Sequence, residues 1–379
     1  MSTFAERILG GACGTVVTVE PDIIVVNDGV SHGAIKDVQH VAYPDRVYVI
    51  YDHDVPTGRP EAAAILKENL TFARTYGCRY IQAQGTGYQY LCNEVVGSGQ
   101  IIAGGGSHGA IYGAREALGI DVSLPELARI IETGRYSTVV PETVYLNLTG
   151  ALPEGVTALD AGLAFLELGK ELKKKALEVY APSFSQHEKE VFLSTAALSG
   201  IAAASFCEEK PAEALTLDLS KIFPMAMGPC QKRPDQGKAP RMPLSDLSGM
   251  ELQAGQIGGY TGGTIEDLRA VAQELEGKKL KLGYRLSICP CTSRDYLLAC
   301  QEGLIEKFID YGAQIHAAGD RSVVIQGAGA MGPGEKLLTT GLYTFAGAMG
   351  VESAEIYTAS PLSVARSSYT GCICPGQES

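Results

Sequence analysis

The residues of this chain best suited to chemistry by type and spacing stand in a glycine-rich turn. An apolar run at 101–103 leads into three glycines and then into Ser107 and His108. Glycines after a strand let the backbone and short polar side chains approach a ligand closely, as α/β active sites require. The chain has six histidines, and the pentapeptide Ser-His-Gly-Ala-Ile occurs at both Ser31 and Ser107. We therefore predict an active site at this turn.

A second polar pair follows another apolar run. Asp52 and His53 come directly after residues 47–51 and shortly before Pro56, which is typical of a presented loop rather than a packed face. A protonated histidine held by a carboxylate can act as a general acid. The alternative is a histidine packed in the core. The loop position favours the acid pair.

Alternating strands and helices must position these pairs. Short β-branched runs bounded by Asp, Gly or Pro indicate buried strands, and longer apolar periodicity indicates helices. Strands are expected at 23–26, 47–51, 101–103 and 143–148, with helices at 60–76 and 125–133. This order predicts an α/β fold with mixed or parallel sheets flanked by helices.

The pattern changes along the chain. We expect an α/β domain at 1–150 and a helix-rich domain at 151–222, with helices near 163–175 and 189–206. Prolines and glycines without periodicity indicate a linker or functional loop at 223–256. Residues 257–379 are expected to form another α/β domain. In it, Thr264 with Asp267 and Thr292 with Asp295 match the capping box that opens a helix.

Composition excludes several classes of protein. The chain has 379 residues, 45% of them hydrophobic and 20% charged, which is typical of a globular protein. Its net charge is −12 and its basic residues are scattered, so we expect neither a nucleic-acid nor a membrane partner. Without a signal-peptide pattern or an apolar run long enough to cross a membrane, the expected location is cytoplasmic. The ten cysteines are then thiols, metal ligands or core residues rather than a disulfide framework.

Seven ordered segments carry a family resemblance. They include Asp-His-Asp-Val-Pro at 52–56, Gly-Gly-Gly-Ser-His at 104–108 and Ala-Glu-Ile-Tyr-Thr-Ala-Ser-Pro at 354–361, and the others lie at 22–28, 140–150, 258–268 and 333–335. Together they resemble the large subunit of isopropylmalate dehydratase, of the aconitase superfamily. These hydro-lyases remove and re-add water on hydroxy-carboxylic acids through a [4Fe-4S] cluster. The resemblance spans almost the whole chain and implies an aconitase-like three-domain large-subunit architecture.

The resemblance implies catalytic roles for the two polar pairs. The family's Asp-His acid, which helps the hydroxyl leave, corresponds to Asp52 and His53. Its Ser-His pair corresponds to Ser107 and His108, but the preceding aspartate is Gly106 here. Another family histidine falls on Tyr88. Further residues expected to line the cavity are Asn27, Asp28, Thr261, Ser293 and Arg294.

The cluster ligands of the family are replaced. Tyr260, Asp320 and Val323 stand where the resemblance places three cysteines, and Tyr343 and Ala348 stand where it places substrate-binding arginines. Tyr260, Asp320 and Tyr343 are expected to line the same cavity. Because iron–sulfur clusters need cysteine thiolates, no cofactor is expected at the usual place.

Cysteines elsewhere leave an alternative open. Cys289, Cys291, Cys372 and Cys374 form two Cys-x-Cys pairs that could hold a relocated [4Fe-4S] cluster or a divalent metal, although this spacing is weak evidence. The other interpretation is apolar filling and an incidental tail pair. Cys291 also precedes a predicted helix start, where the helix dipole lowers a thiol pKa, so it is a candidate base or nucleophile.

The leading hypothesis is a cluster-free, aconitase-like lyase or isomerase that acts on a small carboxylate or hydroxy acid. The family's catalytic base is a serine on a separate small swivelling subunit, so such a subunit is a possible partner. One alternative is a catalytically silent subunit that binds a ligand or scaffolds a partner. The other is a [4Fe-4S] hydro-lyase with relocated ligands.

Overall fold

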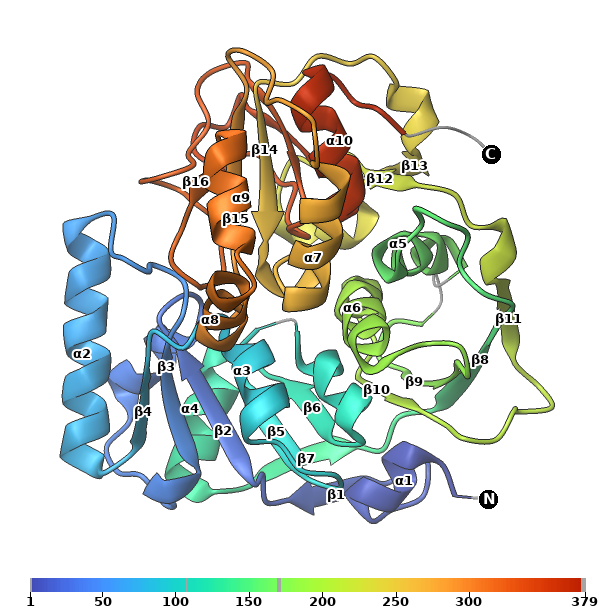
Figure 1. Ribbon diagram of the computed structural model, residues 1–379. Coiled ribbons are helices and arrows are strands. Elements are labelled where there is room, and N and C mark those ends of the chain that lie inside the picture. Colours follow the sequence, from blue (N-terminus) through green and yellow to red (C-terminus); the bar gives the residue numbers. More distant parts are fainter. Residues whose placement is uncertain (1, 107, 169–171, 376–379) are drawn as a thin grey trace. The chain divides into compact units, whose positions relative to one another are not determined.

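The structure, a computed structural model, describes residues 2–106, 108–168 and 172–375 (Figure 1). The chain divides into two compact units. Unit 1 comprises Met1–Ala83, Gly87–Ala151 and Leu168–Leu219, and unit 2 comprises Gln84–Thr86, Leu152–Glu167 and Ser220–Ser379. These units do not follow the predicted boundaries, because the segment Leu152–Glu167 belongs to unit 2. The three-domain division stays a prediction.

A five-stranded parallel sheet forms the first layer of unit 1. Its strand order is β4-β3-β2-β5-β6. The strands are β2 (Ile23–Asn27), β3 (Val47–Tyr51), β4 (Arg79–Gln82), β5 (Ile101–Gly104) and β6 (Leu118–Asp121). All five residues of the central β2 are buried, as its continuous apolar run predicts. The predicted strands at 23–26, 47–51 and 101–103 are confirmed.

Helices and a two-stranded antiparallel sheet complete this part of unit 1. β1 (Val16–Val19) pairs antiparallel with β7 (Tyr136–Val139). The helices are α1 (Phe4–Leu9), α2 (Pro60–Tyr76), α3 (Gly87–Glu94), α4 (Leu124–Thr133), α6 (Gln186–Ala196) and the 3-10 helices η1 (Ser31–Asp37), η2 (Pro44–Arg46), η3 (Gly109–Arg115) and η4 (Ala197–Ser199). α2 has the predicted bounds, because Pro60 suits a first helical turn and Gly77 ends the helix in a left-handed conformation.

A second parallel sheet corrects the expectation of a helix-rich segment at 151–222. Its order is β10-β9-β8-β11. The strands are β8 (Thr143–Thr149), β9 (Ala176–Tyr180), β10 (Ala203–Phe206) and β11 (Leu215–Asp218). The expected helix at 163–175 ends at Leu168, and Lys174 has a positive φ of 68° just before β9. Short apolar runs fit a buried strand or a helix equally well, which is why periodicity missed β9 and assigned β10 to a helix.

Unit 2 is built on a seven-stranded mixed sheet of order β13-β12-β18-β17-β14-β15-β16. The strands are β12 (Met225–Met227), β13 (Arg241–Pro243), β14 (Ala254–Gly258), β15 (Arg285–Cys289), β16 (Gln314–Ile315), β17 (Lys336–Thr339) and β18 (Glu355–Thr358). The helices are α5 (Ala158–Leu168), α7 (Ile265–Glu274), α8 (Ser293–Gln301), α9 (Leu304–Tyr311), α10 (Pro361–Thr370) and the 3-10 helices η5 (Leu219–Lys221), η6 (Arg233–Lys238), η7 (Leu244–Leu247) and η8 (Gly259–Thr261). α10 packs on α7 and β14 (Figure 1).

The segment 223–256 is not a linker. It supplies β12 and β13 and most of β14 to the seven-stranded sheet. A three-residue strand is too short to show an alternation of apolar and polar residues. The prediction for this segment therefore rested only on its prolines and glycines. Both predicted capping boxes are confirmed: Thr264 opens α7 with Asp267, and Thr292 opens α8 with Asp295.

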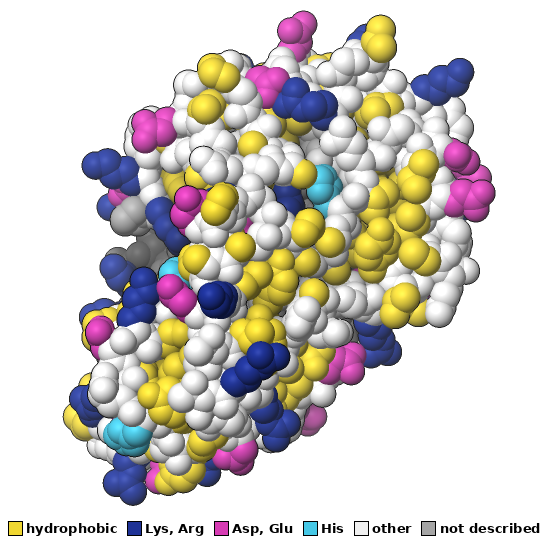
Figure 2. Space-filling model, turned by 90° about the vertical axis from the view of Figure 1, so that its left-hand side faces the viewer, with side chains coloured by type: hydrophobic (Ala, Val, Ile, Leu, Met, Phe, Trp, Pro, Cys, Tyr) yellow, Lys and Arg dark blue, Asp and Glu magenta, His cyan; other side chains and the backbone are white. Residues whose placement is uncertain are grey.

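Charges are mixed on the surface. Basic and acidic side chains are interspersed on the face shown in Figure 2, and neither sign forms a continuous area there. Within the described residues, no helix is long and apolar enough to cross a bilayer.

Candidate acid–base site

The polar pairs of unit 1 lie at one edge of the five-stranded sheet. Asp28 follows β2, Asp52 and His53 follow β3, and His108 follows β5. Because β3, β2 and β5 are parallel neighbours, their carboxyl ends meet at the same edge, where ligands bind in α/β sheets. Ser107 lies outside the described residues.

The carboxylate of Asp28 organises the segment after β3. Its Oδ1 accepts the backbone N–H groups of Asp52 at 2.9 Å and His53 at 3.0 Å, and its Oδ2 accepts that of Asp54 at 3.1 Å. Burial would raise the pKa of Asp28, but the hydrogen bond and charge of His53, with the N–H of Asp52, hold it well below its usual range. Asp28 is therefore a buried anion at neutral pH.

His53 is held between two carboxylates. Its Nδ1 lies 2.6 Å from Oδ1 of Asp52 and 3.7 Å from Oδ1 of Asp28, and its side chain is 21% exposed. Oδ2 of Asp52 accepts the N–H of Gly87 at 2.8 Å. Two buried anions favour the protonated imidazole, which can then donate a proton. The predicted pairing of Asp52 with His53 is thus present in the structure.

A glycine makes room for this imidazole. A Cβ atom on Gly29 would collide with the His53 ring, so the backbone after Asp28 packs directly against it. Sequence analysis did not identify Gly29 or the N–H of Gly87. A glycine directly after a buried acidic residue was the one available signal for Gly29.

Asp28, Asp52 and His53 could also bind a metal ion. Ligand atoms of Asp28, Asp52 and His53 lie within 4.8 Å of one another. However, all four carboxylate oxygens already accept N–H groups, and Nδ1 of His53 is the donor to one of them. Cation binding would have to break these hydrogen bonds, so the geometry favours an acid pair.

The repeated pentapeptide has the same structural place twice. η1 begins at Ser31 after β2, and η3 begins directly after His108, which follows β5. Asn27 shapes the first turn, since its Oδ1 accepts the N–H groups of Val30 and Ser31. A Cβ on Gly105 would lie 2.8 Å from Cβ of Ser31, so the two turns pack together. Both copies of the pentapeptide thus lead into a 3-10 helix after neighbouring strands.

Tyr88 forms part of the wall beside His108. The two rings meet edge to face, with centroids 5.3 Å apart and planes at 78°, and both side chains are buried. A Cβ on Gly106 would collide with the Tyr88 hydroxyl group. By the resemblance, position 88 exchanges a histidine for tyrosine and position 106 an aspartate for glycine, so the two exchanges are sterically linked.

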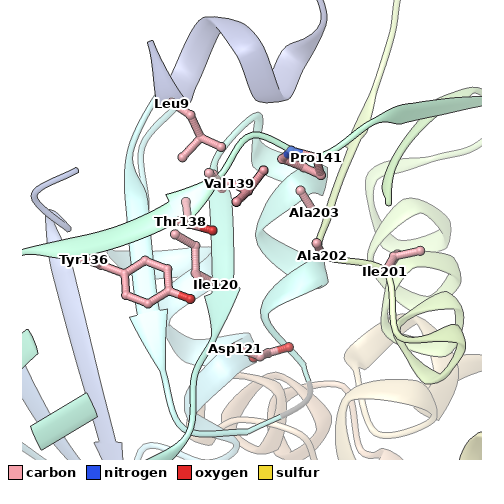
Figure 3. Close-up of a pocket in the computed structure, with 11 residues that line it drawn as sticks. Leu9, Ile120, Asp121, Tyr136, Thr138, Val139, Pro141, Ile201, Ala202 and Ala203 are labelled. Carbon is pink, nitrogen blue, oxygen red and sulfur yellow. The ribbon is translucent and has the colours of Figure 1, made fainter. Parts of the chain in front are cut away.

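Asp121 is a residue of this region that sequence analysis missed. Its Oδ1 accepts the N–H of Gly109 at 3.1 Å, directly after His108. It faces a cavity of about 130 Å³ that is otherwise lined mainly by apolar side chains of unit 1, as Figure 3 shows. The residue is itself exposed to solvent. Its position at the end of β6, in the same sheet, was the available signal.

The predicted residues of unit 2 lie at the carboxyl ends of its parallel strands. Tyr260 and Thr261 follow β14, Ser293 and Arg294 begin α8 after β15, Asp320 follows β16 and Tyr343 follows β17. Tyr260, Thr261, Asp320 and Tyr343 are buried. Oγ1 of Thr261 donates to the carbonyl of Thr340 at 2.6 Å, and Oδ1 of Asp320 accepts the N–H of Ser322 at 2.9 Å. Asp320 is thus a buried carboxylate and not a solvated turn residue.

Cys291 is not an activated thiol. It is fully buried, and burial together with the charge of Asp295 raises its pKa well above the usual value. The expected lowering by the helix dipole was wrong, because loss of hydration and a neighbouring anion outweigh a terminal dipole. Burial likewise raises the pKa of Cys289 to about 12, and its Sγ contacts the carbonyls of Ala317 and Gly319.

These donors do not fit an iron–sulfur cluster. At the three family positions stand a phenol, a carboxylate and a hydrocarbon, namely Tyr260, Asp320 and Val323. In the part of the chain that the structure describes, Cys289, Cys291, Cys372 and Cys374 do not bring three sulfurs within 4.8 Å of one another, as a single divalent metal ion would require. The relocated [4Fe-4S] cluster stays a prediction. No step of the chemistry below passes through a cluster.

Comparisons with known proteins agree with this architecture. The sequence model of the Aconitase family (aconitate hydratase) matches residues 14–178 and 195–371. The homoaconitase large subunit of Thermus thermophilus is 28% identical, covering 99% of this chain and 97% of its own. The 3-isopropylmalate dehydratase large subunit 2 of Methanopyrus kandleri is 29% identical, covering 100% and 99%. The fold is similar to the crystal structure of Thermococcus kodakaraensis aconitase X in its holo-form, with a TM-score of 0.55 at 16% identity, covering 86% of this chain and 84% of that one.

Replacing Asp28 with asparagine should destabilise the protein at neutral pH. The amide group would turn an N–H toward the N–H of Asp54, and D28N should lower the free energy of unfolding by about 2 kcal/mol or more. Because the pKa of Asp28 is lowered on folding, its contribution is present above about pH 4 and is lost on further acidification. Urea unfolding at several pH values measures this.

Asp54→Asn is the matched control for Asp28→Asn. The Asp54 carboxylate lies 3.6 Å from Arg59 in a partly exposed ion pair, so its loss should cost less than about 1 kcal/mol. Equal costs for the two variants would contradict the organising role of Asp28.

Gly106→Ala and Tyr88→Phe should be strongly non-additive. Alanine at 106 collides with the Tyr88 hydroxyl, whereas phenylalanine at 88 leaves the nearest ring carbon 3.2 Å from the new Cβ. G106A alone should cost about 1 to 3 kcal/mol, and much less in the Y88F background. A double-mutant cycle of unfolding free energies measures the coupling. Additive costs would show that the two exchanges are independent.

Proposed function

This chain belongs to the aconitase family of hydro-lyases, and we propose that it removes or adds water on a small hydroxy acid without an iron–sulfur cluster. One observation carries the proposal. An imidazole lies between two buried carboxylates at the ligand-binding edge of a parallel sheet, while no family cluster position holds a thiol. The proton donor of the family reaction is thus retained and its Lewis acid is not.

Dehydration needs an acid for the poor leaving group. His53 donates its proton to the departing hydroxyl, and Asp52 and Asp28 stabilise the cationic form from which it donates. A cluster iron would supply Lewis-acid help worth several kcal/mol. Without that help, a protonated histidine is adequate only for an activated substrate. We therefore favour a hydroxy acid with an acidic C–H beside its carboxylate or carbonyl group.

Substrate binding also departs from the family. Tyr343 and Ala348 replace the two arginines that the resemblance implies, so a tricarboxylate would lack its counter-charges. We infer a smaller carboxylate. In unit 1, we propose Tyr88, His108 and Ser107 as residues that contact it. The predicted cavity residues of unit 2, namely Tyr260, Thr261, Ser293, Arg294 and Asp320, form a set described by itself.

A base must remove the C–H proton. Cys291 is not suited to this role because its pKa is raised by burial. Relatives named large subunits support a separate small subunit as partner, and we propose that it supplies the base. A lysate fraction or co-expressed partner that restores turnover would identify it.

His53→Ala should lower kcat by about 10²- to 10⁴-fold with any substrate that the protein turns over. The assay is a panel of 2- and 3-hydroxycarboxylates, followed by ultraviolet absorbance of the conjugated alkenoate product. Without the imidazole, no acid protonates the departing hydroxyl group. Circular dichroism establishes that the variant is folded.

His40→Ala is the control, because His40 is exposed and lies outside the site. It should retain full turnover. Full activity in H53A would overturn the acid assignment. A ligand that binds tightly but is never converted, with or without a small subunit, would instead favour a catalytically silent binding protein.

A further inference from the structure

A second cavity lies on the sheet of unit 2, and none of the residues that line it is among those assigned above. It has a volume of about 140 Å³ and is lined by β14, β15, β16 and β17 and by the glycine-rich segment at 329–330. Its polar lining residues are Gln256, Arg285, Ser287 and Gln314. This volume exceeds that of a few water molecules and suits a small polar ligand.

Arg321 is a buried cation beside this cavity. It is only 8% exposed, and its Nη2 donates to the backbone carbonyl of Ala328. Among the described residues, no carboxylate lies within 4.0 Å of its guanidinium group, which makes no ion pair. Buried charges are normally paired, because an unpaired one loses its hydration without compensation. The chain thus buries a guanidinium group that makes no direct ion pair with a described carboxylate, next in sequence to the buried Asp320.

The guanidinium reaches the cavity wall at Gly329. A Cβ on Gly329 would lie 3.6 Å from Nη2 of Arg321 and 3.9 Å from Oγ of Ser287, and both Gly329 and Ser287 line the cavity. The guanidinium group and the hydroxyl group therefore both lie within 4 Å of the space that a side chain at Gly329 would occupy. The guanidinium group and the hydroxyl group can both donate hydrogen bonds to a ligand in this space.

Neighbouring groups do not neutralise Arg321. The carboxylate of Glu335 is engaged by Arg285, with contacts of 2.9 and 2.6 Å, and by the N–H of Gly332. Nε2 of Gln256 donates to the backbone carbonyl of Arg321 at 2.8 Å, which fixes the segment. His316, whose Nε2 lies 3.1 Å from Oγ of Ser287, has its pKa lowered to about 4 by burial and by the charge of Arg321, so it is neutral at pH 7.

We propose that this cavity binds a small oxyanion, a carboxylate or phosphate group, with Arg321 supplying the charge and Ser287 a hydrogen bond. The planar fork of a guanidinium matches either oxyanion. Arg321 lies in the segment 319–323, where the resemblance places two cluster cysteines. The site is independent of the acid pair of unit 1, so it can be tested without any turnover.

Calorimetric titration of the full chain with malonate and, separately, with inorganic phosphate at constant ionic strength tests the proposal. At least one of them should bind at a single site and raise the melting temperature of the wild-type protein. Arg321→Gln should weaken that binding about 10-fold or more, and Ser287→Ala should weaken it less. Preference for malonate identifies a carboxylate site, and preference for phosphate identifies a phosphate site.

Arg269→Gln is the charge-matched control. Arg269 is paired with Glu302 on the surface of α7 and does not line the cavity, so R269Q should bind the anion like the wild type. If R321Q proves unstable, Arg321→Lys keeps the charge without the fork and should bind at an intermediate strength. The proposal is overturned if neither anion binds, or if R321Q or R321K binds as tightly as R269Q.

Discussion

The carboxylate of Asp28 is the constraint on which the acid site depends. It lies at the end of a wholly buried strand and accepts three consecutive N–H groups from the turn after the neighbouring strand. This interaction fixes the backbone that carries Asp52 and His53, and it adds a second anion beside the imidazole. One buried carboxylate therefore fixes the turn that carries the imidazole and lies beside it.

Side chains other than cysteine stand at the positions where the family places its cluster ligands. Buried Tyr260 and Asp320 bring a phenol and a carboxylate where thiolates would bind iron, and the remaining thiols Cys289 and Cys291 are kept protonated by burial. In unit 1, the tyrosine at position 88 requires a glycine at position 106, because its hydroxyl group fills the space of a Cβ atom there. At these family positions the chain offers no thiolate to bind iron.

Much of the fold and part of the site could be predicted from the sequence. Strands such as β2 and β3 are continuous apolar runs, and the family motifs located Asp52 and His53. The sequence could not show β9 and β10, since short apolar runs fit either structure, nor the three N–H groups that Asp28 accepts, since backbone donors have no residue type. The pKa of Cys291 was misjudged because its burial depends on residues distant in sequence.

The central claim is that His53 acts as an acid in a protein without an iron–sulfur cluster. Iron and acid-labile sulfide, measured per chain after strictly anaerobic purification, test it most directly. The account predicts a colourless protein with neither element in stoichiometric amount, whose turnover is unchanged by iron chelators. About four irons and four sulfides per chain, with activity that follows their content, would contradict it.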